Sequence, residues 1–211
     1  MLKKLFYGTM AFLRRLYYRV RRRKLKNSAP TILCNNCFGG LVYHNLGLQF
    51  RSPTVNLFFP NRDFFAFAQD LPAYLAAELR ELKDTGREYP VGELSANGRR
   101  IEIYFMHYPD FETAAKKWNE RKARMDLSNI HLIFQTAYIT EETQAAFAAL
   151  PYKNKLLIAG DNPYGSSDVV THPVLAKADY RPGELLEYKS RFSLRRHMDD
   201  IDYIGFLNRK P

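Results

Sequence analysis

This sequence has few cysteines, no long apolar run and no acidic residue before Asp63. Two cysteines in 211 residues cannot supply a disulfide framework, which excludes a small disulfide-stapled secreted scaffold. No uninterrupted apolar run approaches the roughly 18 residues that cross a bilayer, so we expect no transmembrane helix. The cysteine usage is typical of a reducing compartment, and we therefore expect a cytoplasmic protein.

The positive charge of the chain is concentrated at its start. The formal net charge is +10, and residues 1–26 contain ten of the 32 lysines and arginines and no acid. The rest of the chain balances 22 cations against 22 acids. We therefore divide the sequence into a basic arm, residues 1–29, and one domain, residues 30–211. With 46% apolar residues, that domain is long enough to bury a substantial core.

Apolar residues of the arm, such as Phe12, Leu16 and Val20, recur at spacings of three and four, with arginines between them. This pattern predicts an amphipathic basic helix. Such a helix binds the surface of an anionic bilayer, and each cation contributes on the order of 1 kcal/mol. We expect residues 1–26 to hold the protein on the cytoplasmic face of the inner membrane. Packing of the helix on the domain, and disorder, remain alternatives. Nucleic acid is not expected as a partner, because the neutral domain offers no second basic surface.

The domain alternates strand and helix patterns. This order predicts an α/β fold, a three-layer sandwich around a mixed, mostly parallel sheet. The expected strands are 31–34, 54–58, 129–135 and 155–159, and the expected helices are 39–48, 64–82 with a break near Pro72, 111–125, 140–150 and 199–207. The Asn97-Gly98 pair between two apolar runs predicts a β-hairpin, which we expect to join the same sheet.

The densest group of functional side chains follows the first expected strand. Loops after strands are where α/β proteins bind ligands. Glycines let a ligand approach the backbone, and free amides at the start of a helix favour phosphate. The predicted substrate-binding residues of this loop are Asn35, Asn36, Gly39 and Gly40. The alternative is a sharp turn that the asparagines cap, since neither a Walker loop nor G-x-G-x-x-G is present.

Three residues are candidates for catalysis. His44 lies about one helical turn beyond Gly40, and that turn is expected to bring it back towards the loop as a base or phosphate anchor. His107 follows the hairpin strand, and Asp161 follows the strand 155–159, where it could act as a base or metal ligand. A core position for each histidine and a loop-forming role for Asp161 are the alternatives.

Trp118, Arg121 and Arg124 recur every three residues in one expected helix. Arginines on a shared face clamp phosphate or carboxylate groups bidentately, so we predict that these three residues bind substrate. The alternative is a solvated helix with a half-buried tryptophan.

Cys34 and Cys37 have the spacing of zinc ligands or of a redox pair. A structural zinc site needs four ligands, and no second C-x-x-C exists, so we favour small buried cysteines. Asp200 and Asp202 fall in a helical pattern in which side chains two apart diverge. The sequence therefore predicts no metal and no cofactor.

Several blocks of the chain resemble a bacterial family. They are Cys34–Gly40, Tyr43-His44, Ser52–Leu57, Tyr89–Gly92, His107-Tyr108 and Ala115–Arg121. The family is the domain of unknown function DUF1919, whose members are often labelled exopolysaccharide biosynthesis proteins. The resemblance covers about residues 30–208 and leaves out the basic arm. It implies an α/β fold and a link to cell-surface glycan loci, and it implies no catalytic residue.

We favour an enzyme of cell-surface polysaccharide assembly (exopolysaccharide, capsule or lipopolysaccharide) that transfers a glycosyl or related group. Its expected partners are a nucleotide sugar or other phosphorylated donor and a glycan or lipid-linked acceptor. In this hypothesis residues 35–40 bind the donor diphosphate, and Arg121 and Arg124 neutralise an anionic substrate. One alternative is a non-catalytic, membrane-associated adaptor of a polysaccharide-assembly complex. Another is an acyl transferase or hydrolase with Cys34 or Cys37 as nucleophile.

Overall fold

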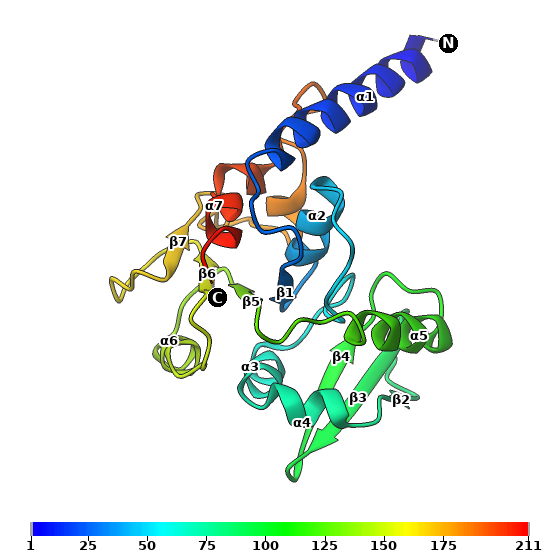
Figure 1. Cartoon of the computed structure of the whole chain (residues 1–211), viewed down its shortest axis with the longest axis vertical. Coiled ribbons are helices and arrows are strands. Elements are labelled where there is room, and N and C mark those ends of the chain that lie inside the picture. The colour runs from blue at the N-terminus through cyan, green and yellow to red at the C-terminus, as the bar shows by residue number, and fades with distance from the viewer. Residues whose placement is uncertain (1, 211) are drawn as a thin grey trace.

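The computed structural model describes the backbone of residues 2–210 and the side chains of residues 6–210 (Figure 1). Its centre is a parallel sheet of four strands in the order β1 (Thr31–Cys34), β5 (Ile130–Gln135), β6 (Lys155–Ala159) and β7 (Val169–Thr171). The three expected strands in this sheet are confirmed, and β7 is an addition that the sequence analysis did not predict. β1, β5 and β6 are almost fully buried, as strands covered on both faces are.

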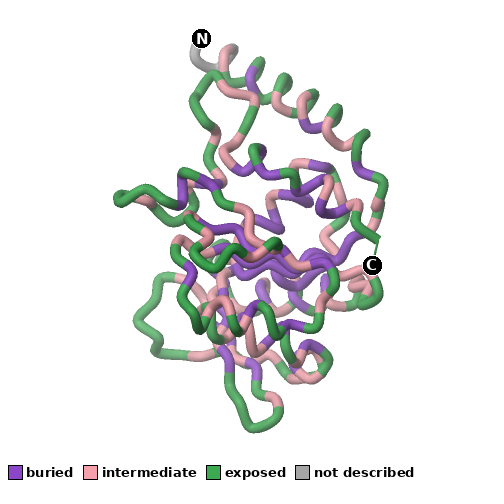
Figure 2. The backbone as a smooth tube through the Cα atoms, turned by 90° about the vertical axis from the view of Figure 1, so that its left-hand side faces the viewer, coloured by how far each residue is buried: buried purple, intermediate pink, exposed green. Residues whose placement is uncertain are grey.

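Neighbouring residues of these strands belong to two different cores, because side chains alternate across a sheet. Leu33 and Phe134 face one core, together with α3 (Asn61–Gln69), α5 (Phe111–Lys122) and α6 (Glu141–Ala148). Ile32 and Ile133 face the other, together with α2 (Phe38–Asn45) and α7 (Tyr203–Leu207). Figure 2 shows the buried strands running between these layers. The predicted α/β class with helices on both faces is confirmed.

The hairpin does not join the parallel sheet. β3 (Val91–Ala96) and β4 (Arg99–Tyr104) pair with β2 (Arg80–Leu82) in a separate antiparallel sheet. The Asn97-Gly98 turn is confirmed, and both residues have the positive φ that such a turn requires. The expectation of one mixed sheet is therefore wrong in this respect. The hairpin does not hydrogen-bond to the parallel sheet, and its apolar side packs in the same core as α3 and α4 (Leu71–Ala76).

Two other expected elements differ from the structure. The strand expected at 54–58 is reduced to a single bridge between Phe58 and Tyr104. The helix expected at 64–82 is divided before Pro72, as predicted, but it ends at Ala76, and residues 80–82 form β2 instead. The helices α5 and α6 begin at side-chain caps, since Asp110 and Thr140 accept hydrogen bonds from the backbone amides three residues further on.

The predicted N-terminal helix is present as α1 (Leu2–Arg22), and its side chains at residues 2–5 lie outside the described part. The helix packs on the domain through Met10 and Tyr18, which are buried. The contact between α1 and the domain is centred on the carboxylate of Asp199, in the C-terminal part of the chain. Asp199 accepts hydrogen bonds from the hydroxyls of Tyr18 and Tyr203, each at 2.8 Å, and lies 3.4 Å from the guanidinium of Arg21. The structure therefore shows the alternative in which the arm packs on the domain, for the part of α1 from Met10 to Arg21.

Replacing Asp199 by alanine is expected to lower the free energy of unfolding by about 3–5 kcal/mol, because two buried hydroxyls and the Arg21 guanidinium lose their shared acceptor. The loss is measurable by urea denaturation, and trypsin should cut α1 faster in the variant than in the wild type. Tyr18→Phe is the graded control, which removes one hydrogen bond and should cost about 1 kcal/mol. Unchanged stability of the alanine variant would contradict this account of the arm.

His131 of β5 is fully buried, and its burial lowers its pKa. Below its ordinary pKa of about 6.5, the unfolded chain therefore binds more protons than the folded chain, and the folded state loses stability as the pH falls. Burial also lowers the pKa of His172, so both residues contribute to this loss. His131→Leu should make the fall in unfolding free energy between about pH 7 and pH 5 shallower. The same fall in both proteins, measured by urea denaturation at the two pH values, would show that His131 plays no part.

Candidate functional site

A cavity of about 790 Å³ lies beyond the carboxyl ends of β1 and β5. Its walls come from four places: the loop after β1, the loop after β5, residues 56–61 with the end of the hairpin, and the segment 180–186. The lining residues are Asn36, Cys37, Leu41, Asn56, Leu57, Phe58, Asn61, Met106, His107, Gln135, Thr136, Ala137, Tyr180, Pro182, Gly183 and Leu186. We call it the strand-end cavity. Its position is the one where α/β proteins bind ligands.

Asn35 builds this cavity without facing it. Its side chain is buried, and its amide donates to the carbonyl of Gln135 and accepts from the backbone NH of Gln135, both at 3.0 Å. These two bonds extend the pairing of β1 with β5 by one residue, and Asn35 is not among the residues that line the cavity. The predicted substrate-binding role of Asn35 is therefore not supported, and the residue positions the strand ends.

Asn36 lines the cavity but is also held in place. Its Oδ1 accepts from the amide of Phe38 at 3.0 Å, which caps the start of α2, and its Nδ2 donates to Oε1 of Gln135 at 3.0 Å. Gln135 in turn donates from Nε2 to the hydroxyl of Tyr180 at 3.2 Å. These hydrogen bonds form a chain from Asn36 through Gln135 to Tyr180. The chain holds the polar side chains of this wall of the cavity in fixed orientations.

Gly39 and Gly40 serve packing and not ligand approach. A Cβ on Gly39 would lie 3.0 Å from Cβ of Cys34, and one on Gly40 would lie 3.2 Å from Oδ1 of Asn56. Both glycines are buried and neither lines the cavity. They let α2 lie close against β1 and the loop 55–56, so their predicted role as substrate-binding residues is not supported.

The three catalytic candidates lie in different parts of the structure. His107 is exposed and lines the strand-end cavity, and it makes no hydrogen bond or ion pair within residues 2–210. His44 lies in the last turn of α2, while the loop lies at the first turn, so the helix carries it away from that cavity. Asp161 follows β6 as predicted, but it is exposed and lies outside the cavity lining. Only His107 is brought to the loop.

The three residues of α5 do not form a substrate clamp. Trp118 is buried in the core against Phe67 and Phe105. Arg121 is 7% exposed, and its Nη1 donates to the carbonyl of Val55 at 3.1 Å and to the hydroxyl of Tyr108.

Arg124 points elsewhere and lies 3.8 Å from the carboxylate of Glu120. Residues three apart on a helix neighbour each other, but the first two are buried against the 50–55 and 105–108 segments. The predicted substrate-binding role of this set is therefore not supported.

The strand-end cavity is lined by polar groups that are mostly amides. Its lining, as the structure describes it, holds four side-chain amides and one imidazole, and no lysine, arginine, aspartate or glutamate. The sequence analysis missed Asn56, Asn61, Gln135 and Tyr180. One signal was present in the sequence: Asn56 stands directly before the apolar run Leu57–Phe59. In the structure it adopts a positive φ of 62°, which asparagine tolerates better than most residues. The segment 180–186 has no regular pattern that could have predicted its place.

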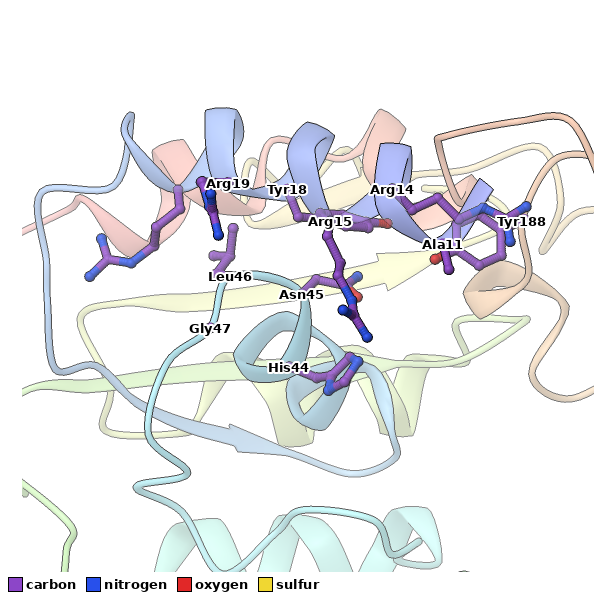
Figure 3. Close-up of a pocket in the computed structure, with 11 residues that line it drawn as sticks. Ala11, Arg14, Arg15, Tyr18, Arg19, His44, Asn45, Leu46, Gly47 and Tyr188 are labelled. Atoms are coloured by element: carbon purple, nitrogen blue, oxygen red, sulfur yellow. The ribbon is translucent and has the colours of Figure 1, made fainter. Parts of the chain in front are cut away.

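A second cavity, of about 480 Å³, lies between α1 and the end of α2 (Figure 3). Its lining includes Arg14, Arg15, Arg19, Arg22 and His44 and contains no carboxylate in the part of the chain described. Figure 3 shows Arg15 pointing from α1 towards His44. We call it the arginine cleft. His44 thus has a place in a cavity, but it is a different cavity from the one that His107 lines.

Comparison with known proteins places this architecture in a family. The model of the domain of unknown function DUF1919 matches residues 9–208. The chain belongs to the DUF1919 family. An uncharacterized protein of Haemophilus influenzae is 31% identical over 191 residues, covering 90% of this chain and 89% of that protein. The match begins inside α1, which corrects the expectation that the DUF1919 resemblance leaves out the arm, and fits the packing of α1 on the domain.

Two absences within residues 2–210 bear on the site. No helix in this range is both long and apolar enough to span a bilayer. No group of three or more histidine, cysteine, aspartate or glutamate side chains within it could hold a metal ion. The two cysteines of this DUF1919 protein are free thiols.

The thiols are predicted to be unreactive in the folded protein. Burial raises the pKa of Cys34 to about 12 and that of Cys37 to about 11, so neither is a thiolate near neutral pH. Alkylation by iodoacetamide at pH 8 should be roughly 100-fold slower than for a free thiol and should become complete in urea. Rapid labelling of Cys37 in the native protein, located by mass spectrometry, would contradict this and restore the nucleophile hypothesis.

Proposed function

We propose that this DUF1919 protein is an enzyme of cell-surface polysaccharide assembly that holds a sugar in the strand-end cavity. The observation that carries the proposal is the composition of that cavity. Amides both donate and accept hydrogen bonds, which matches the hydroxyls of a sugar, and they are present as Asn36, Asn56, Asn61 and Gln135. Apolar side chains such as Leu57 and Phe58 complete the walls. A volume of about 790 Å³ lies within the usual range for small-ligand sites.

The reaction that best fits these groups is the transfer of a glycosyl or related group to a hydroxyl. His107 accepts the proton of the acceptor hydroxyl as the new bond from that oxygen to the donor carbon forms. The bond from that carbon to the leaving group breaks at the same time, and the leaving group takes the electron pair. Because the cavity lining has no cation, the sugar occupies the cavity and a phosphate leaving group must lie outside its walls. We therefore replace the hypothesis that residues 35–40 bind the donor diphosphate with the proposal that the sugar binds at this position.

The labels of other DUF1919 members favour a cell-surface glycan over other carbohydrates as the final product. The basic arm favours work at the cytoplasmic face of the inner membrane, on a glycan or lipid-linked acceptor. A nucleotide sugar or other phosphorylated sugar is the donor class in this proposal.

A second candidate is a non-catalytic adaptor that binds the glycan and a membrane. The observation that favours it is the lack of a carboxylate in the described lining, since many glycosyl-transfer sites use one. In this case the cavity recognises a sugar, and His107 contributes only a hydrogen bond.

His107→Ala separates the two candidates. Cells in which this variant replaces the wild type should lose surface glycan by at least about 100-fold, because the base is removed, while the purified variant should still show a rise in melting temperature with the sugar that stabilises the wild type. Asp161→Ala is the matched control, an exposed candidate outside the cavity, and should leave the glycan unchanged.

The outcomes of this test are distinct. Normal glycan with His107→Ala supports the adaptor and contradicts the enzyme. A panel of nucleotide sugars and neutral oligosaccharides that leaves the melting temperature of the wild type unchanged would contradict sugar binding in either form.

A further inference from the structure

The helix α1 has an apolar face that the domain leaves uncovered. Phe12 is 66% exposed, and Leu16 and Val20 are about half exposed. These residues recur every four positions and therefore lie on one side of the helix. Met10 and Tyr18, on another side, are buried against the domain. Packing on the domain therefore accounts for only some of the apolar side chains of α1. Figure 2 shows both exposed and buried positions along this helix.

The arginine cleft lies next to this exposed face. Arg15 is three residues after Phe12, and Arg19 is three residues after Leu16, so cationic and apolar side chains are neighbours on the helix surface. Both arginines line the cleft, and neither makes a hydrogen bond or ion pair among the side chains of residues 6–210. Their guanidinium groups retain all five donors.

The hydrogen bonds of the other two arginines of the cleft go to backbone carbonyls, and Arg14 also stacks on the ring of Tyr188, with 3.5 Å from its guanidinium carbon to the ring centroid. Arg14 donates to the carbonyls of Ser193 and Arg191, each at 3.1 Å, and Arg22 donates to the carbonyl of Leu25 at 3.3 Å. Backbone carbonyls carry no net charge, so the positive charge of the cleft is not neutralised by the described lining. This arrangement differs from Arg21, which is paired with Asp199.

We propose that the arginine cleft binds the phosphate group of a membrane lipid while the exposed apolar face of α1 lies in the same bilayer surface. Arginine binds phosphate bidentately, and an amphipathic helix with a basic flank rests at the depth of the headgroups. His44, at the floor of the cleft, offers a ring N–H as a further donor. This inference rests on the membrane association in the proposed function and does not depend on the sugar-binding cavity.

The test uses the full-length protein and vesicle sedimentation. Vesicles of phosphatidylcholine alone are compared with vesicles that also contain phosphatidic acid or phosphatidylglycerol. The double variant Arg15→Gln/Arg19→Gln removes two charges from the cleft. Arg23→Gln/Lys24→Gln removes two charges just beyond it, at exposed residues that do not line the cleft, and serves as the matched control.

The wild type is expected to prefer vesicles with anionic phosphate lipids. The cleft variant should bind them at least about tenfold more weakly than the control variant, because it loses a bidentate site as well as charge. Phe12→Ser/Leu16→Ser should weaken binding to every vesicle that the wild type binds. Circular dichroism should show all the variants folded, since the substituted side chains are not buried.

Two results would overturn the proposal. Equal losses in the cleft and control variants would mean that general attraction to the surface, and not a site, accounts for binding. Calorimetric binding of inorganic diphosphate to the cleft, combined with no preference for anionic vesicles, would assign the cleft to a soluble phosphate ligand. Neither result alters the effect of a sugar on the melting temperature, so failure here and failure of the proposed function can be told apart.

Discussion

The parallel pairing of β1 with β5 is the interaction on which the rest of this structure depends. It joins Thr31–Cys34 to Ile130–Ile133, about 100 residues apart in sequence, and so closes a loop that contains the whole antiparallel sheet and four helices. Asn35 continues the pairing with its side chain where the backbone ladder ends. Beyond that point the segments that follow β1 and β5 separate, and the strand-end cavity lies between them. The pairing thus holds the segments that form the cavity walls.

The strand-end cavity and the arginine cleft differ in the charge of their linings. The strand-end cavity presents amides, an imidazole and apolar groups, whereas the arginine cleft presents cations without carboxylates among the residues described. They lie towards opposite ends of α2, whose eight residues rise about 12 Å along its axis. One helix therefore connects a region suited to neutral hydroxyls with a region suited to phosphate. Close packing of Gly39 and Gly40 fixes this helix against β1 and the loop 55–56, so the two regions keep their relative positions.

Much of the fold could be predicted from the sequence, and less of the site. Short apolar runs gave β1, β5 and β6, and the Asn97-Gly98 pair gave the hairpin, because each signal is local. The separation into two sheets depends on which core the hairpin packs against, and no local pattern contains that information. The location of the site after β1 was predictable from strand order, but the roles of its residues were not. Asn35 and Arg121 carry polar groups typical of ligand binding, yet the fold uses those groups for its own backbone. Asn61 and Tyr180 reach the cavity from distant segments, and only the tertiary structure brings them there.

The bond between Tyr18 and Asp199 joins residues 181 positions apart. The backbone amide of Lys26 likewise donates to the side chain of Asn208, so the beginning and the end of the chain are tied together at several points. During synthesis, at roughly 5–20 residues per second, Tyr18 of α1 is therefore made about 10–35 seconds before Asp199. The cationic and apolar side chains of α1 are all free for that interval. A nascent chain with this order of events closes its arm on the domain last.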